Sequence, residues 1–232
     1  MKVIISGGFE GAYRELLPEF ERAAGVRVQT GSGASQGTGP QVIAAQLARG
    51  VPADVVILSR EGLNELIAAG RIAPGTDRDL ASTPIGAAVR KGAPKPDVRT
   101  VQALERALLE AGTVAVPGST SGIFLVREVF PRLGLEGKID VRVTPRGTGA
   151  AAMVAAGEAR LALLPVSEIL AAPAIELAGR IAPEIQLVQV FSAASVAGTK
   201  ELELAQRLIA FLGSQRAAAA ITRSGMDPLA RG

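Results

Sequence analysis

Cysteine and histidine are both absent from the 232 residues of the chain. Without cysteine there is no disulfide, no thiol nucleophile and no zinc-thiolate site. Without histidine the chain lacks the commonest general base and metal ligand of proteins. Any proton transfer would have to use Asp, Glu, Lys, Arg, Tyr or Ser, and we expect neither a metal site nor a cofactor.

Aromatic residues are scarce, although the chain as a whole is hydrophobic. They make up 3% of the residues, with no tryptophan and one tyrosine, whereas hydrophobic residues make up 48%. The core must therefore be built from Val, Ile, Leu and Ala, which suits strands that are buried on both faces beneath helices. No apolar run approaches the roughly 18 residues of a membrane helix, so we expect no membrane span.

Charge of one sign is not concentrated anywhere. Charged residues are 20% of the chain, the formal net charge is +3, and Arg90-Lys91 is the one adjacent pair of basic residues. A nucleic-acid surface would need a basic patch, so we expect no nucleic-acid partner. Mild positive charge suits a small anionic ligand.

Strands and helices are predicted to alternate from the N-terminus onward. Apolar runs predict strands, and apolar residues at helical spacing between them predict helices. The predicted order is a strand at Lys2–Ile5, a helix at 11–24, a strand at 26–30, a helix at 41–49, a strand at Asp54–Leu58 and a helix at 60–69. This alternation predicts a parallel sheet with right-handed crossovers.

The chain is predicted to form two lobes. A Pro- and Gly-rich segment at Thr83–Val98 interrupts the alternation, which then resumes, and the apolar stretch Ile185–Ala197 reads as a strand that returns to the first lobe. We predict an α/β fold of two doubly wound lobes, residues 1–82 plus 192–232 and residues 83–191, joined by a two-segment hinge. The ligand cleft is expected between the lobes, and the protein is expected to be a monomer.

Small hydroxyl residues and glycine follow nearly every predicted strand. Open α/β sheets bind ligands beyond the carboxyl ends of their strands. One such loop is explained by helix capping, but six of them indicate an anion held by N–H and O–H groups. The predicted ligand-binding residues are Ser6, Gly7, Ser32, Ser35, Gln36, Ser59, Arg60, Gly118, Ser119, Thr120, Ser121, Arg146 and Ser167.

The glycine-rich loop "GSGASQGTG" does not predict a nucleotide site. Its glycines at Gly31, Gly33 and Gly37 give GxGxxxG rather than GxGxxG, and the sequence GK[ST] of a phosphate-binding P-loop is absent. Dinucleotide and P-loop chemistry are therefore excluded.

The order of these segments resembles that of the bacterial molybdate-binding proteins, which are periplasmic binding proteins of type 2 topology. The most specific match is "ARGVPADVVILS", residues 48–59, and the resemblance covers essentially the whole chain. It implies an anion bound by Ser6 and by the loops Ser32–Ser35, Pro117–Ser121 and Pro165–Ser167. It also implies delivery to an ABC permease, with hinge closure on the ligand.

The segment "LALLPVSEILAAPAIELAGRIAPEIQ", residues 161–186, is instead similar to the bacterial aconitate isomerases, which share this fold. Molybdate-binding proteins usually carry a tyrosine where this chain has Pro165-Val166-Ser167. The resemblance therefore leaves two ligand classes open, a molybdate-like oxyanion and a small polycarboxylate. Arginines such as Arg60, Arg90 and Arg146 suit carboxylates through bidentate hydrogen bonds.

Two functions remain open from the sequence. We expect a binding protein for a small anion rather than an enzyme; if the chain is an enzyme, it is an intramolecular isomerase of an unsaturated tricarboxylate. The base would then be one of Glu168, Glu10, Tyr13 or a lysine, and the sequence does not favour any of these positions strongly, with Glu168 as the first candidate. The first residues, "MKVIISGG", are too short an apolar segment for a signal peptide. We expect a periplasmic protein if the chain is a mature form, and otherwise a cytoplasmic one.

Overall fold

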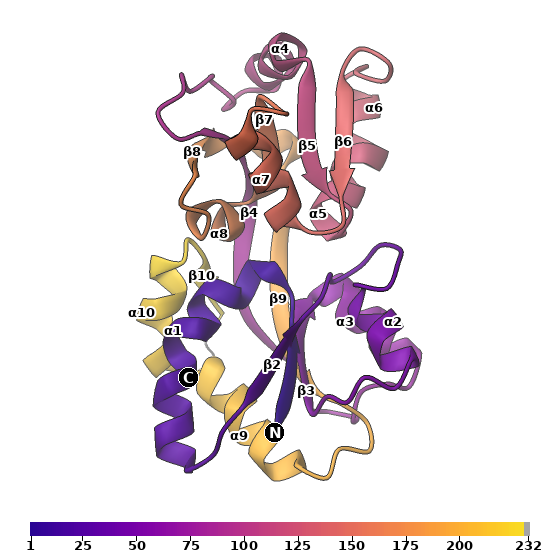
Figure 1. Cartoon of the computed structure of the whole chain (residues 1–232), viewed down its shortest axis with the longest axis vertical. Helices are drawn as coiled ribbons and strands as arrows, with labels where there is room; N and C mark the ends of the chain where they lie inside the picture. The colour runs from indigo at the N-terminus through magenta and orange to yellow at the C-terminus, as the bar shows by residue number, and fades with distance from the viewer. Residues whose placement is uncertain (230–232) are drawn as a thin grey trace. The chain divides into compact units, whose positions relative to one another are not determined.

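A computed structural model describes residues 1–229 of the chain (Figure 1). It consists of two compact units, one formed by Met1–Ser82 together with the chain from Val190 onward, and the other by Thr83–Gln189. We call them unit 1 and unit 2. The chain passes from unit 1 to unit 2 within strand β4 (Arg78–Arg90) and returns within β9 (Val188–Ser195). The sequence placed the first passage after residue 82 and the return after residue 191.

Unit 1 is a mixed sheet, with parallel and antiparallel strand pairs, that is covered by helices on both faces. Its strands lie in the order β2-β1-β3-β9-β4, in which β9 is antiparallel to β3. Besides β4 and β9, unit 1 contains β1 (Lys2–Ile5), β2 (Gln29–Ser32), β3 (Val55–Ser59) and the short β10 (Asp227–Pro228), which pairs with β4. The helices are α1 (Gly7–Ala24), α2 (Ile43–Ala48), α3 (Arg60–Ala68), α9 (Leu202–Leu212) and α10 (Gln215–Arg223).

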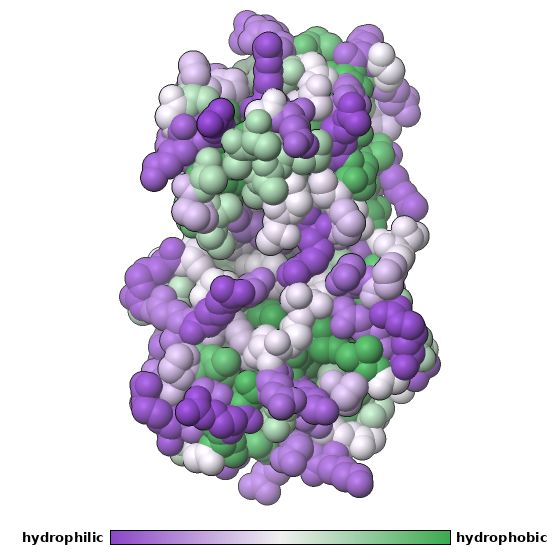
Figure 2. Space-filling view, in the orientation of Figure 1, coloured by the Kyte–Doolittle hydropathy of each residue, from purple (hydrophilic) through white to green (hydrophobic). Residues whose placement is uncertain are grey.

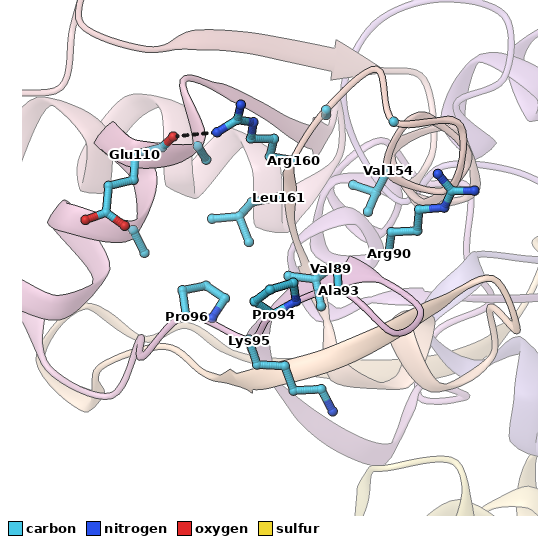
Figure 3. Close-up of a pocket in the computed structure, with 14 residues that line it drawn as sticks. Val89, Arg90, Ala93, Pro94, Lys95, Pro96, Glu110, Val154, Arg160 and Leu161 are labelled. Atoms are coloured by element: carbon cyan, nitrogen blue, oxygen red, sulfur yellow. Dashed lines mark hydrogen bonds between the residues drawn. The ribbon is translucent and has the colours of Figure 1, made fainter.

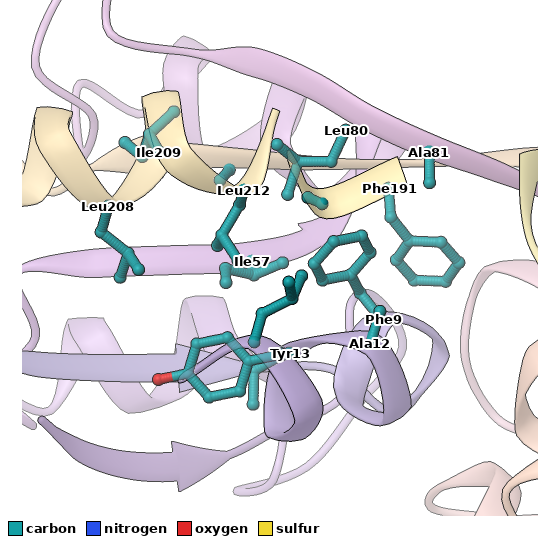
Figure 4. Packing of buried hydrophobic residues seen from close by; sticks show 14 of the residues in the cluster. Phe9, Ala12, Tyr13, Ile57, Leu80, Ala81, Phe191, Leu208, Ile209 and Leu212 are labelled. Carbon is teal, nitrogen blue, oxygen red and sulfur yellow. The ribbon is translucent and has the colours of Figure 1, made fainter. Parts of the chain in front are cut away.

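Successive residues of the central strands of unit 1 enter opposite cores, because side chains alternate across a strand. Ile5 and Ile57 join the cluster beneath α1, α9 and α10, which holds Phe9, Tyr13 and Phe191 (Figure 4). The residues next to them on the strands, such as Ile4, Val56 and Leu58, instead join the cluster beneath α2 and α3. This two-sided burial explains why the strands read as continuous apolar runs.

Unit 2 repeats this arrangement with fewer residues. Its sheet has the order β4-β7-β5-β6, with β8 beside β4. The strands are β5 (Thr113–Pro117), β6 (Asp140–Thr144), β7 (Leu161–Pro165) and β8 (Ile175–Arg180). The helical segments are α4 (Val101–Ala111), α5 (Thr120–Phe124), a π-helical turn (Leu125–Val129), α6 (Phe130–Arg132), α7 (Gly147–Ala156), α8 (Val166–Leu170) and a 3₁₀ turn (Pro183–Ile185).

The predicted α/β class is confirmed, but several element boundaries differ from the prediction. Helix α1 begins at Gly7 rather than at residue 11, and strand β2 begins at Gln29 rather than at residue 26. Strand β8 was not predicted at all. Some glycines that were predicted to lie in loops are the first residues of helices. A glycine in a first turn has no Cβ and therefore leaves room for a close neighbour.

The surface is mixed in polarity, and the described helices are short or polar. Hydrophilic and hydrophobic residues are interspersed over the face that Figure 2 draws. Within residues 1–229, no helix combines the length and the apolar character that crossing a membrane requires.

Candidate functional site

The carboxyl ends of three strands in unit 1 meet at one edge of its sheet. Strand β1 runs parallel to β2 and to β3, with Ile5 opposite Ser32 on one side and opposite Ile57 on the other. Two backbone hydrogen bonds continue this register beyond the strand: the Ser6 N–H donates to the Ile57 carbonyl at 2.8 Å, and the Gly33 N–H donates to the Ile5 carbonyl at 2.9 Å. The segments that follow β1, β2 and β3 are therefore held together.

Ser6 is the central residue of this edge. It is 4% exposed, and its Oγ has no hydrogen-bond partner in the described part of the chain. It occupies the N-cap position of the 18-residue helix α1, where a serine normally accepts a hydrogen bond from the first turn, but its side chain makes no such bond. A buried hydroxyl and the free N–H groups of a first turn thus lie side by side, which is the arrangement that binds anions.

Ser35 and Ser59 form a short hydrogen-bonded chain beside it. The Ser59 N–H donates to Ser35 Oγ at 2.9 Å, and the Gly62 N–H donates to Ser59 Oγ at 3.2 Å. Both serines are buried. The Ser35 hydroxyl accepts in this chain, so its own proton remains to be donated, and no described residue accepts it. Ser35 is therefore a second buried donor at the same edge.

Of the other residues predicted in unit 1, Gly7 lies beside Ser6, whereas Ser32 and Gln36 are engaged elsewhere. Gly7 is the half-buried first residue of α1 and contributes its N–H to the first turn. Ser32 is exposed at the end of β2, where its carbonyl accepts from Gln46 Nε2 at 3.0 Å. The side-chain amide of Gln36 donates to Glu65. Ser32 and Gln36 therefore have less support as ligand-binding residues than Ser6.

Arg60 is engaged within unit 1 rather than held ready for a ligand. Its Nη1 pairs with Asp77 Oδ2 at 2.8 Å and its Nε donates to Asp79 Oδ1 at 2.8 Å. Asp79 is in turn hydrogen-bonded by Ser192 Oγ at 2.6 Å. Burial opposes the charged form of Arg60, but the hydrogen bonds that Arg60 donates to Asp77 and Asp79 outweigh it and raise the pKa of Arg60 above the ordinary value. This geometry gives no support to the prediction that Arg60 binds the ligand.

Unit 2 gathers a similar set of residues at the carboxyl ends of β5, β6 and β7. These strands are parallel, with Pro117 opposite Thr144. The Gly118 N–H donates to the Thr144 carbonyl at 2.6 Å, which joins the loops after β5 and β6. Gly118 and Ser119 are half-buried, and Thr120 and Ser121 are buried at the start of α5.

Ser167 and Glu168 follow β7 at the same edge of unit 2. Ser167 is 4% exposed, and its Oγ lacks a hydrogen-bond partner among the described residues. Glu168 lies against the N-terminus of α7, since a Cβ placed on Gly147 would come within 1.6 Å of Glu168 Oε2. The half-buried Arg146 is the N-cap residue of that helix. A helix N-terminus stabilises a carboxylate, so this is a favourable place for Glu168.

The two alternative bases in α1 are poorly suited to proton transfer. Tyr13 is 1% exposed, its hydroxyl is 2.9 Å from Thr30 Oγ1, and burial raises its pKa to about 12. Glu10 pairs with Arg14 at 2.5 Å, one turn along the same helix. No group of acidic residues in the described chain is arranged to hold a metal ion.

Sequence reasoning missed two glycines that shape the edge in unit 1. A Cβ on Gly8 would lie 1.9 Å from Phe191 Cζ, and a Cβ on Gly62 would lie 2.3 Å from the carbonyl oxygen of Ser35. These glycines let the first turns of α1 and α3 come close to the sheet. Their position within four residues of a strand end was visible in the sequence, but the contacts that require them were not.

Comparison with known proteins settles the family. Residues 1–227 match the family described as bacterial extracellular solute-binding protein. The chain belongs to this family. The aconitate isomerase of a Pseudomonas species is 38% identical over 231 residues, which are 99% of this chain and 88% of that protein.

Solved structures of solute-binding proteins share the fold. The periplasmic molybdate-binding protein of Azotobacter vinelandii superposes with a TM-score of 0.75 at 20% identity, covering 97% of this chain and 98% of its own. The sulfate-binding protein of Mycobacterium tuberculosis gives a TM-score of 0.77 at 20% identity, covering 99% and 86%. The predicted family and the periplasmic binding protein fold are both confirmed.

Proposed function

We propose that this solute-binding protein captures a small, multiply charged anion mainly through neutral hydroxyl and N–H donors. The observation that carries the proposal is Ser6, a buried serine at the N-terminus of α1 whose hydroxyl neither caps the helix nor bonds to any described residue. A buried polar group without a partner is costly unless a ligand supplies one. Ser35 adds a second unused donor at the same strand ends.

The chemistry of these donors favours a small dianion or trianion. Serine hydroxyls and helix N–H groups compensate negative charge without a fixed cation. Molybdate and sulfate, which name two of the structural relatives, and aconitate, which names the sequence relative, are all small anions of this kind. This shared chemistry supports the ligand class.

We propose further that Gly118, Ser119, Thr120, Ser121, Arg146 and Ser167 supply the second set of donors. Their position at the strand ends of unit 2, and the unpartnered Oγ of Ser167, support this assignment. The expectation that both sets hold one ligand comes from the sequence and stays a prediction. Family membership supports a protein that works in the periplasm and delivers its ligand to an ABC permease. That the protein is a monomer stays a prediction from the sequence.

A thermal-shift panel tests the ligand class. The panel contains molybdate, tungstate, sulfate, phosphate, citrate, tricarballylate, and cis- and trans-aconitate. A ligand at about 100 times its dissociation constant stabilises the folded state by roughly 2.7 kcal/mol, which raises the melting temperature measurably. A rise with one group of these anions supports the proposal and selects between oxyanion and carboxylate. No rise with any of them contradicts it.

The second candidate function is isomerisation of an unsaturated tricarboxylate, and the specific observation in its favour is the 38% identity to aconitate isomerase over 99% of the chain. Such a reaction removes a proton from one carbon of an allylic system and returns one to the carbon at its other end. It needs a base and donors that stabilise the enolate-like intermediate. Glu168, placed against α7 beside the loops of unit 2, is the residue that we assign as base.

An NMR assay in D₂O tests this candidate directly. If the chain is an isomerase, wild-type protein converts trans-aconitate to cis-aconitate and introduces deuterium at the carbon that receives the proton. Glu168→Gln should abolish the conversion, while the matched change Glu184→Gln, in the 3₁₀ turn, should leave it intact. If the wild type binds aconitate without converting it or exchanging its protons, the isomerase function is refuted and the binding function remains.

A further inference from the structure

Unit 2 contains a pocket at the opposite edge of its sheet from the hydroxyl loops. Strands β5 and β7 run parallel and carry the hydroxyl loops at their carboxyl ends, whereas the pocket lies where β7 begins at Leu161 and β4 ends at Arg90. Its volume is about 480 Å³, within the roughly 300–1,000 Å³ that is usual for small-molecule sites. The pocket is therefore large enough for an organic ligand and separate from the loops already described.

The floor of the pocket is apolar and built from small side chains. Ala107 and Ala111 of α4, Ala159, Val154 of α7 and Leu161 of β7 line it. Ala107, Val154, Ala159 and Leu161 are each at most 5% exposed. Because alanine fills little space, these positions leave a hollow where larger side chains would have closed the core. An apolar body would find a desolvated surface here.

The outer wall is the segment from Ala93 to Pro96, and it is held in place before any ligand arrives. Its two prolines restrict the backbone. The Ala93 N–H donates to the Arg90 carbonyl at 2.9 Å, and Lys95 Nζ pairs with Glu176 at 3.2 Å. Figure 3 shows Pro94, Pro96 and Leu161 around the open space. A wall fixed in this way lowers the entropy cost of binding.

The rim carries more positive than negative charge. Arg90, Lys95 and Arg160 line the pocket, with Glu110 as the single acid among the lining residues. Lys95 is engaged by Glu176, and Arg160 donates to the Glu110 carbonyl at the end of α4 at 3.4 Å. Arg90 is exposed beside Val154 (Figure 3), and its guanidinium has no partner among the described residues. It is the cation that remains available to a ligand.

We propose that this pocket binds a small amphiphilic carboxylate, with its apolar chain on the alanine-rich floor and its carboxylate at Arg90. The apolar lining selects against the compact, strongly hydrated anions proposed for the hydroxyl loops. The positive rim selects a carboxylate over a neutral or cationic amphiphile. The chain thus has a second ligand site that is independent of its proposed function in anion capture.

Octanoate titrated into the ¹⁵N-labelled full chain tests this site, with octanamide as the uncharged match and acetate as the match without a chain. We expect saturable binding of octanoate with amide shift changes centred on the residues that line the pocket. Octanamide should bind about two- to fivefold more weakly, as expected for the loss of one exposed ion pair. Acetate should cause no saturable shifts there.

Two variants with matched controls assign the contacts. Arg90→Gln should weaken octanoate binding about two- to fivefold, whereas Arg127→Gln, at an exposed residue of unit 2 outside the pocket, should not. Ala111→Phe should fill the pocket and weaken binding on the order of tenfold or more. Its control is Ala152→Phe, at an exposed position of α7 outside the pocket.

The octanoate titration can fail or succeed independently of the test of the anion site. Octanoate should bind equally well to Ser6→Ala and in the presence of whichever anion stabilises the wild type most. No binding at millimolar octanoate, equal binding of octanamide, or full affinity in Ala111→Phe would overturn the proposal. So would shift changes confined to the hydroxyl loops.

Discussion

Three buried serines at or just after the ends of strands in unit 1 have different roles, and hydrogen bonding distinguishes them. Ser59 accepts from the first turn of α3, and Ser35 accepts from the Ser59 N–H. Ser6 accepts from nothing in the described chain, although it has the same position relative to its helix as Ser59. The same residue type in the same local context thus stabilises the fold at one strand end and leaves a donor for a ligand at another.

This difference predicts different effects of two alanine substitutions on stability. Ser59→Ala removes an N-cap and should lower the free energy of unfolding by about 1 kcal/mol. Ser6→Ala removes a buried hydroxyl without a partner and should leave the free energy of unfolding unchanged or slightly higher. Urea denaturation of both variants without ligand measures this. A loss at Ser6 as large as that at Ser59 would mean that Ser6 has a structural role.

Tyr13 predicts a specific loss of stability in alkali. Burial raises its pKa to about 12, above the ordinary value of about 10. Since the folded state favours the neutral phenol, the resulting stability is complete below pH 10 and is lost as the pH rises from 10 through 12. The maximum loss is about 2.7 kcal/mol. Unfolding free energies of wild type and Tyr13→Phe should diverge in slope over this range, and parallel curves would contradict the assignment.

At the scale of elements, the sequence predicted the strands that are buried on both faces better than it predicted the exposed strand β2 or the start of α1. Apolar runs placed β1 at Lys2–Ile5 exactly as observed in the structure, and β3 within one residue. Helix α1 was predicted to start four residues late, because Gly7 and Gly8 read as a turn. The structure shows why glycine is there: Gly8 packs against the ring of Phe191, a residue far away in the sequence. Such a contact leaves no local signal.

The candidate site could likewise be predicted from the sequence only in part. The positions of Ser6 and Ser59 after buried strands were readable, because parallel strands share the edge at which they end. The engagement of Arg60 with Asp77 and Asp79 was not, because it joins the start of α3 to residues 17 and 19 positions further along the chain. Sequence therefore identified donors by position but could not show which of them were already used.

Two glycines of α1 give a matched test of this packing. Alanine favours a helix over glycine by about 1 kcal/mol. At Gly11 a Cβ would meet only Ser224 Cβ at 3.6 Å, so Gly11→Ala should stabilise the protein by about that amount. At Gly8 the added Cβ would overlap the Phe191 ring, so Gly8→Ala should destabilise it by roughly 1–3 kcal/mol. Thermal denaturation of both variants measures the difference, and stabilisation by Gly8→Ala would refute the close packing.

At the scale of the whole molecule, the absence of histidine and the neutrality of the hydroxyl and N–H donors proposed in unit 1 have a common consequence. Hydroxyl and N–H groups do not titrate near neutrality, and the chain has no side chain with an ordinary pKa between 5 and 8. The affinity for sulfate or molybdate, if either binds, should change by less than about twofold between pH 6 and 9. Calorimetric titration at several pH values measures it, and a tenfold change would indicate a titrating group in the site.

The central claim is that a small anion is bound at the strand ends of unit 1 through Ser6. Isothermal titration of the anion that stabilises the wild type most tests it most directly, in Ser6→Ala and in the control Ser214→Ala, whose hydroxyl donates to the Phe211 carbonyl. A hydrogen bond to a charged group contributes about 1.5–3 kcal/mol. We therefore predict an affinity loss of about tenfold or more for Ser6→Ala and none for Ser214→Ala. Equal affinity of Ser6→Ala and wild type would contradict the account.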